Sequence, residues 1–145
     1  GVVFTQKVAA ELHPYTTMAA VDSAGNISYA GGRYQYNRLA GRTTSFGTYC
    51  LVADTTPPVI TPQFEQGQDM RSKNRLSVRL SDNFAGIASY NAYIDEEWVA
   101  VDYSRGRIHI DLRAEGISGG KKHTIRVVAK DNCGNKTSWE GEFIR

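Results

Sequence analysis

The sequence lacks the features that mark nucleic-acid-binding and membrane proteins. Its 145 residues carry a formal net charge of only +2, and the basic residues are scattered rather than clustered. Nucleic-acid binding requires a basic face or stripe, so no nucleic-acid partner is expected. No apolar run approaches the roughly 20 residues that span a bilayer, so no membrane span is expected either. The chain opens with Gly1 and has no charged n-region, so no signal peptide is expected in these residues. A leading Gly without Met suggests a processed or trimmed chain, in which case the targeting signal would lie outside these residues.

Cysteine is equally scarce, with only Cys50 and Cys133 in the chain. A disulfide between them would join two separate modules and would pair a strand residue with a residue in the tight turn 131–135. Such positions seldom provide the matched Cβ geometry that a disulfide requires. Two unpaired thiols that pack as small residues are the favoured interpretation, and cysteine usage leaves the redox compartment open.

Catalytic and metal-binding motifs are also missing. His13, His109 and His123 are isolated, and the spacings His-x-His, His-Glu-x-x-His and Cys-x-x-Cys do not occur. Zinc sites normally need such spacings. Ser45 lacks the Gly-x-Ser-x-Gly elbow of serine hydrolases. The acids at 95–97 occupy one hairpin turn, without the second acidic group of a glycosidase. We therefore expect no enzyme activity and no cofactor.

The chain does contain one strong boundary signal, the run Asp54-Thr-Thr-Pro-Pro58. Two consecutive prolines cannot donate backbone hydrogen bonds, and each restricts the residue before it to extended conformations. The run therefore ends one strand and starts the next. We expect it to divide the chain into a small β module at residues 1–55 and a second domain at residues 56–145.

The second domain has the pattern of short strands with one buried face. Apolar and polar residues alternate, so that Leu80 and Val127 are expected to face inward and Arg79 outward. The expected strands are residues 59–64, 75–82, 87–95, 98–103, 107–112, 123–131 and 136–144. Seven strands in about 88 residues favour an all-β, immunoglobulin-like antiparallel β-sandwich over a barrel.

The first module is also strand-like. Its expected strands are residues 2–8, 16–22, 26–29, 33–36 and 43–53, with a helical turn at 9–12 that Pro14 limits. A module of about 54 residues buries little surface by itself. We therefore expect either a truncated, partial sandwich whose natural domain begins upstream or a module that packs on its neighbour.

One short segment occurs twice. Residues 20–26 (AVDSAGN) match residues 129–135 (AKDNCGN), and Gly32 and Gly141 follow at the same offset. Two explanations are open, a true repeat of the module or a chance match between two hairpin turns. The second is possible because Asp, Asn and Gly are favoured in such turns.

The candidate metal ligands are three acidic residues at strand ends, Asp54, Asp82 and Asp131. Strand ends can meet at one pole of a sandwich, and Ca²⁺ takes about six to eight oxygen ligands of the kind that such loops supply. Asp side chains in turns also accept backbone N–H bonds that need no ion. Three carboxylates are few for the coordination number of calcium. Turn bonding is therefore the preferred interpretation, and no metal site is expected.

Trp98 and Tyr103 are the candidates for a sugar-binding surface. Aromatic rings have one apolar body and a polar tip, but most rings in a sandwich are expected in its core. Successive strand residues point to opposite faces, which places Trp98 and Tyr103 on opposite faces. At most one of them can join a flat external platform.

The chain also resembles a known family over most of residues 45–145. The segments that carry the resemblance are 45–49 (SFGTY), 53–60 (ADTTPPVI), 82–87 (DNxxGI), 90–95 (YxAxID), 98–99 (WV) and 120–135 (GxxHTxxVxAxDNxGN). Together they resemble the C-terminal region of bacterial envelope proteins that carry an N-terminal lysostaphin-type zinc peptidase domain followed by immunoglobulin-like modules. The zinc-binding histidine motifs of that family are absent here, so no peptidase residue can be carried over.

The resemblance implies a non-catalytic accessory or spacer region of a larger exported protein, located in the periplasm or at the cell surface. The implied partners are neighbouring domains of the same polypeptide, such as a peptidoglycan peptidase domain. The alternative is a glycan- or peptidoglycan-binding module that uses surface aromatics. The aromatic content and a mildly basic pI near 8.6 motivate this alternative.

Overall fold

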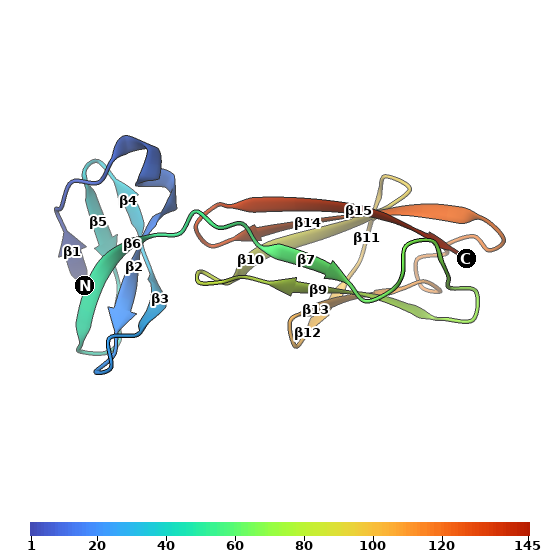
Figure 1. Ribbon diagram of the computed structural model, residues 1–145, viewed down its shortest axis with the longest axis horizontal. Helices are drawn as coiled ribbons and strands as arrows, with labels where there is room; N and C mark the ends of the chain where they lie inside the picture. The colour runs from blue at the N-terminus through green and yellow to red at the C-terminus, as the bar shows by residue number, and fades with distance from the viewer.

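The computed structural model describes residues 1–145 as two β-sandwiches joined end to end by an extended linker (Figure 1). The strands of the first module run across the long axis of the molecule, whereas those of the second run along it (Figure 1). The linker is the Thr-Thr-Pro-Pro segment, which no strand includes. The chain therefore changes strand direction where the prolines interrupt backbone pairing.

The second module packs a five-stranded sheet against a four-stranded sheet, with the orders β11-β10-β14-β15-β8 and β12-β13-β9-β7. Its strands are β7 (Val59–Pro62), β8 (Gln68–Asp69), β9 (Arg75–Ser81), β10 (Ile87–Ile94), β11 (Glu97–Val99), β12 (Asp102–Ser104), β13 (Arg107–Asp111), β14 (Lys122–Asp131) and β15 (Lys136–Ile144). All pairs are antiparallel except β15 with β8. The prediction of an all-β, immunoglobulin-like antiparallel β-sandwich is confirmed.

The core of this module lies between the two sheets and consists of aliphatic side chains with one phenylalanine. Leu80 on β9 is 3% exposed and Val127 on β14 is fully buried, so the two face inward from opposite sheets. Arg79, between two buried neighbours on β9, is exposed. The largest fully buried apolar side chains of the module are Phe143, Leu76, Ile108, Ile110, Leu112, Ile125, Val78 and Val127. The expected strand register is therefore correct, because a shift by one residue would exchange these faces.

Two expectations for the second module were wrong. The expected strand 98–103 is two strands, β11 and β12, and the chain crosses from one sheet to the other between them. Residues 65–74, where no strand was expected, contain the short strand β8, which extends the five-stranded sheet beside β15. Neither feature alters the alternation of side chains, so hydrophobic pattern alone does not reveal it.

The first module packs two three-stranded sheets, with the orders β1-β5-β4 and β3-β2-β6. Its elements are β1 (Val2–Phe4), the 3₁₀ helix η1 (Ala10–Tyr15), β2 (Thr16–Val21), β3 (Ile27–Gly31), β4 (Arg33–Gln35), β5 (Arg38–Gly41) and β6 (Thr48–Ala53). Its small core is Met18, Tyr34 and Leu39. Strand β5 was not expected, and Pro14 lies inside η1 rather than ending it. No helix here is long and apolar enough to cross a membrane.

Candidate functional site

Three acidic side chains converge where the linker meets the second module. Asp54 follows β6, Asp82 follows β9, and Asp131 ends β14. One ligand oxygen of each lies within 4.8 Å of the other two. Asp131 is 1% exposed and Asp54 is 4% exposed, while Asp82 is partly buried. The structure thus brings together all three strand-end acids that the sequence singled out.

Asp131 closes the hairpin turn between β14 and β15. Its Oδ1 accepts the backbone N–H groups of Cys133 at 2.9 Å and Asn135 at 2.8 Å, and its Oδ2 accepts the side-chain amide of Asn135 at 2.8 Å. Asp22 makes the equivalent three bonds in the turn between β2 and β3, at 2.9, 2.8 and 2.9 Å. The two matching sequence segments therefore form the same turn, but Asp22 is exposed and Asp131 is buried.

Asp54 connects the linker to both modules. Its backbone N–H donates to the carbonyl of Tyr15 in the first module at 3.0 Å. Its Oδ2 accepts the N–H of Ala85 at 3.3 Å, and its backbone carbonyl accepts the side-chain amide of Asn135 at 2.8 Å. These contacts fix Asp54 against the β9–β10 and β14–β15 turns, so the acid cluster involves the linker and both sheets of the second sandwich.

Only one of the two carboxylate oxygens of Asp82 accepts hydrogen bonds. Its Oδ2 accepts the backbone N–H groups of Phe84 at 3.1 Å and Gly86 at 2.9 Å. Its Oδ1 is shielded from solvent and has no hydrogen-bond partner. No other buried side-chain oxygen or nitrogen in the chain lacks a hydrogen-bond partner. Buried polar atoms are nearly always paired, so this oxygen requires an explanation.

Cys133 lies beside the cluster and is 5% exposed. Burial, together with the negative charges of Asp54, Asp131 and Asp82, raises the pKa of its thiol to about 11. The thiol is therefore protonated at neutral pH, and the thiolate is the form that acts as a nucleophile. Both Cys133 and Cys50 are free thiols.

The two modules contact each other through a small interface. Tyr29 of the first module meets Phe84 of the second edge-on, with ring centroids 6.2 Å apart. An open groove of about 750 Å³ lies between the modules and is lined by Tyr34 and Thr17 on one side and by Lys130 and Asp131 on the other. Of the three clustered acids, Asp131 lines this groove.

The two aromatic candidates lie on different sheets. Trp98 on β11 is 62% exposed, and its Nε1 donates to Oδ1 of Asn91 at 3.1 Å. Tyr103 on β12 is 44% exposed and stacks on Tyr90, with ring centroids 5.0 Å apart. They form no common platform. Near Trp98, the guanidinium of Arg126 lies 4.1 Å from the ring centroid of Tyr93, its register partner across β10 and β14.

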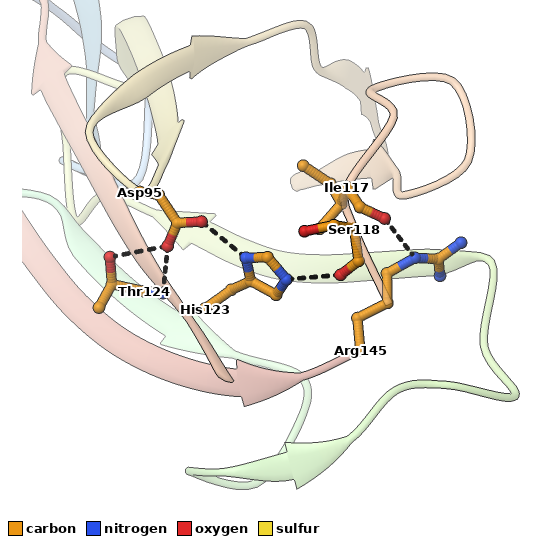
Figure 2. Close-up of polar contacts among 6 residues, drawn as sticks. All are labelled: Asp95, Ile117, Ser118, His123, Thr124 and Arg145. Carbon is orange, nitrogen blue, oxygen red and sulfur yellow. Dashed lines mark hydrogen bonds and ion pairs between the residues drawn. The ribbon is translucent and has the colours of Figure 1, made fainter. Parts of the chain in front are cut away.

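His123 and Asp95 form a pair that the sequence analysis did not identify. Figure 2 shows the imidazole between the Asp95 carboxylate, 2.6 Å from Nδ1, and the carbonyl of Ser118, 2.8 Å from Nε2. Asp95 also accepts the backbone N–H of Thr124 at 3.0 Å. At least one of the acids in the hairpin turn 95–97 therefore has a structural role. The partners are 28 residues apart, so no local motif could indicate the pair.

A row of serine, histidine and aspartate crosses the outer face of the four-stranded sheet. Ser77, His109 and Asp102 are register partners on β9, β13 and β12. Ser77 Oγ lies 2.7 Å from His109 Nδ1, but no hydrogen bond joins His109 to Asp102. A hydrolytic triad requires the acid to orient the histidine. The row therefore lacks the contact that would activate the serine.

No protein-family model matches this chain, and no curated protein matches it. The solved structures that match include one described as "Structures of Clostridium thermocellum CbhA fibronectin(III)-like modules". That structure shares 18% sequence identity with this chain at a TM-score of 0.46, over 87% of this chain and 58% of its own length. This chain therefore spans less than two thirds of that structure.

Proposed function

We propose that this chain is a non-catalytic spacer in a larger exported bacterial cell-envelope protein. Its role would be to hold a neighbouring domain, such as a peptidoglycan peptidase, at a set distance and orientation. The observation that supports this role most is the anchoring of Asp54, which is bonded to the first module through Tyr15 and to the second through Ala85 and Asn135. A linker residue bonded on both sides favours one relative orientation of the modules over many.

The spacer role predicts a single elongated particle in solution. Small-angle scattering of the purified chain should fit one fixed arrangement of the modules, and peptidoglycan incubated with the chain should release no soluble fragments. A profile that needs a broad ensemble of arrangements would contradict the spacer role. Fragment release that is abolished by Ser77→Ala or His109→Ala would instead establish an enzyme.

A glycan-binding module is the second candidate, because Trp98 is an exposed ring that donates a hydrogen bond to its neighbour Asn91. Beside it, Asn91, Tyr93 and Arg126 line a shallow groove of about 370 Å³ on the outer face of the five-stranded sheet. Aromatic rings with adjacent amide and guanidinium groups supply both stacking and hydrogen bonds for a sugar.

Calorimetry against peptidoglycan fragments and simple polysaccharides tests this candidate. Trp98→Ala should abolish any binding, whereas Tyr103→Ala, an exposed ring on the other sheet, should leave it intact. Absence of binding to all these glycans leaves the spacer as the function of the chain. Equal loss in both variants would place the binding surface elsewhere.

A further inference from the structure

We propose that Asp54, Asp82 and Asp131 form a binding site for one divalent cation, preferentially Ca²⁺, at the junction of the two modules. The oxygens come from three segments far apart in the sequence, the linker, the β9–β10 turn and the end of β14. The site depends on these contacts alone and not on the spacer role proposed above.

The first argument is uncompensated charge. Two of the three carboxylates are at least nine-tenths buried, and one oxygen of each lies within 4.8 Å of the others. The ion pairs of the chain all involve other acids, namely Asp69, Glu142, Asp95 and Glu96. Buried charges are normally paired or bound to a metal, because desolvation otherwise makes them costly. No basic side chain pairs with this cluster, whereas a divalent cation would neutralise most of its charge.

The second argument is the unpaired oxygen of Asp82. Two backbone N–H groups bind its Oδ2, but its Oδ1 is removed from solvent without any donor. Turn formation explains the first oxygen and leaves the second without a partner. A cation bound to Oδ1 would satisfy it and would explain why this one buried atom has no hydrogen bond.

The third argument is geometric. Three oxygens within 4.8 Å of one another have a common point at most about 2.8 Å from each, and Ca²⁺ binds oxygen at about 2.3–2.6 Å. Movements of a few tenths of an ångström would therefore complete three bonds. Mg²⁺ requires about 2.0–2.1 Å and near-ideal octahedral geometry, which needs a larger contraction. The remaining ligands of Ca²⁺ would be water or backbone carbonyls, and the groove beside Asp131 admits water.

Asp22 shows that the turn bonds made by Asp131 do not require an acidic cluster. It makes the same turn bonds as Asp131 with the same residue spacing, but it is exposed and belongs to no acidic cluster. The turn therefore forms without any second carboxylate nearby. The clustering of Asp54 and Asp82 around Asp131 is an additional feature that the turn does not require.

The test is thermal unfolding of the purified full chain, stripped with a chelator and then supplied with CaCl₂ or MgCl₂. Trp98 and Trp139, both in the second module, provide a fluorescence signal specific to the module that holds the site. CaCl₂ is added to about 10 mM, which exceeds the dissociation constants of weak extracellular calcium sites. We expect calcium to raise the melting temperature by several degrees, more than magnesium does, because a ligand of the folded state stabilises it. Calorimetry should give one ion per chain.

Two single-charge variants control the experiment. Asp82→Asn retains an oxygen for the turn N–H groups but removes the charge, so it should abolish the calcium response. Without calcium it should melt no lower than the parent, since a repulsive charge is gone. Asp22→Asn should respond to calcium as the parent does. The proposal is overturned if calcium leaves the melting temperature of the parent unchanged, or if Asp82→Asn keeps the full response.

Discussion

The carboxylate of Asp95 lies 2.6 Å from Nδ1 of His123, a side chain that is only 2% exposed. Both ring nitrogens of His123 face oxygen acceptors, so the arrangement is fully satisfied when both carry a proton. The Ser118 carbonyl that faces Nε2 of His123 lies in the loop between β13 and β14. A second bond holds this loop, because Nε of Arg145 donates to the carbonyl of Ile117 at 3.2 Å (Figure 2). The long loop before β14 is thus fastened to the β10–β11 turn and to the C-terminal residue.

This pair predicts a defined pH dependence. Partial burial raises the pKa of Asp95, but the hydrogen bond from His123, the N–H of Thr124 and the charges of His123 and Lys121 together lower it below its ordinary value. A carboxyl group with a lowered folded-state pKa stabilises the fold above its ordinary pKa, about 3.9, and loses that contribution as the pH falls through the lowered value. Ionised Asp95 should therefore stabilise the protein at pH 6 and progressively less below about pH 4.

Urea unfolding of the parent and Asp95→Asn, followed by tryptophan fluorescence, measures this effect. The parent should be the more stable protein at about pH 6, and the difference should shrink at about pH 3, where protonation begins to neutralise the Asp95 carboxylate. A difference that is constant between these pH values would show that the charge of Asp95 contributes nothing to stability.

A second prediction compares neighbours on β9. Leu80→Ala should lower the free energy of unfolding by about 2–5 kcal/mol, because it removes a core side chain and leaves a cavity. Arg79→Ala, one residue away on the exposed face, should change it by no more than about 0.5 kcal/mol. Chemical denaturation of both variants gives the comparison. Similar losses at the two positions would contradict the inward and outward assignments of this strand.

The core of the second module could be predicted because its signal is local. Leu76, Val78 and Leu80 repeat with the period of a strand, and each is buried as that period requires. Short strands do not carry such a signal. β8 has two residues and is defined by pairing with β15, more than 70 positions along the chain. The crossing from β11 to β12 likewise depends on which sheet offers a free edge.

The candidate site shows the same limit. The sequence indicated Asp54, Asp82 and Asp131 individually, because Asp is common at strand ends where it accepts backbone N–H bonds. Their convergence depends on how the linker packs against two turns. The unpaired Oδ1 of Asp82 has no counterpart in sequence at all. From sequence, turn bonding was preferred over a calcium site, whereas the clustering of the three acids and the unpaired oxygen of Asp82 favour a cation.

A third prediction concerns the linker. Replacing Pro57 and Pro58 by Gly should broaden the range of module orientations, because Gly-rich segments are flexible and Pro-rich segments are semi-rigid. The second sandwich should remain folded, since the carbonyl of Pro58, which accepts the hydroxyl of Thr137 at 2.6 Å, is retained by Gly. Scattering from the variant should show a broader distance distribution, while the tryptophan melting curve should still show one cooperative transition. Identical scattering profiles would mean that Asp54 and its contacts fix the orientation without the prolines.

A fourth prediction concerns Gly141 in β15, over which the indole of Trp139 lies. A Cβ added at Gly141 would overlap Cη2 of Trp139 and lie 2.7 Å from its Cζ2. The indole cannot simply rotate away, because it packs on the core and meets Phe64 edge-on with centroids 6.0 Å apart. Gly141→Ala should therefore lower the free energy of unfolding by about 1–3 kcal/mol, the usual cost of overpacking a core, and shift the tryptophan emission.

The matched control for this substitution is Gly119→Ala. At Gly119 the nearest atom to an added Cβ is the carbonyl oxygen of Arg145 at 4.0 Å, and the backbone there does not occupy the left-handed region. The methyl group meets no obstacle and restricts the unfolded chain, so stability should stay unchanged or rise by up to about 1 kcal/mol. Urea unfolding and emission spectra of the two variants, recorded side by side, separate a steric effect from a general effect of removing glycine. If Gly141→Ala matches Gly119→Ala in both measurements, the indole does not lie over Gly141, and Trp139 instead packs against the core in another rotamer.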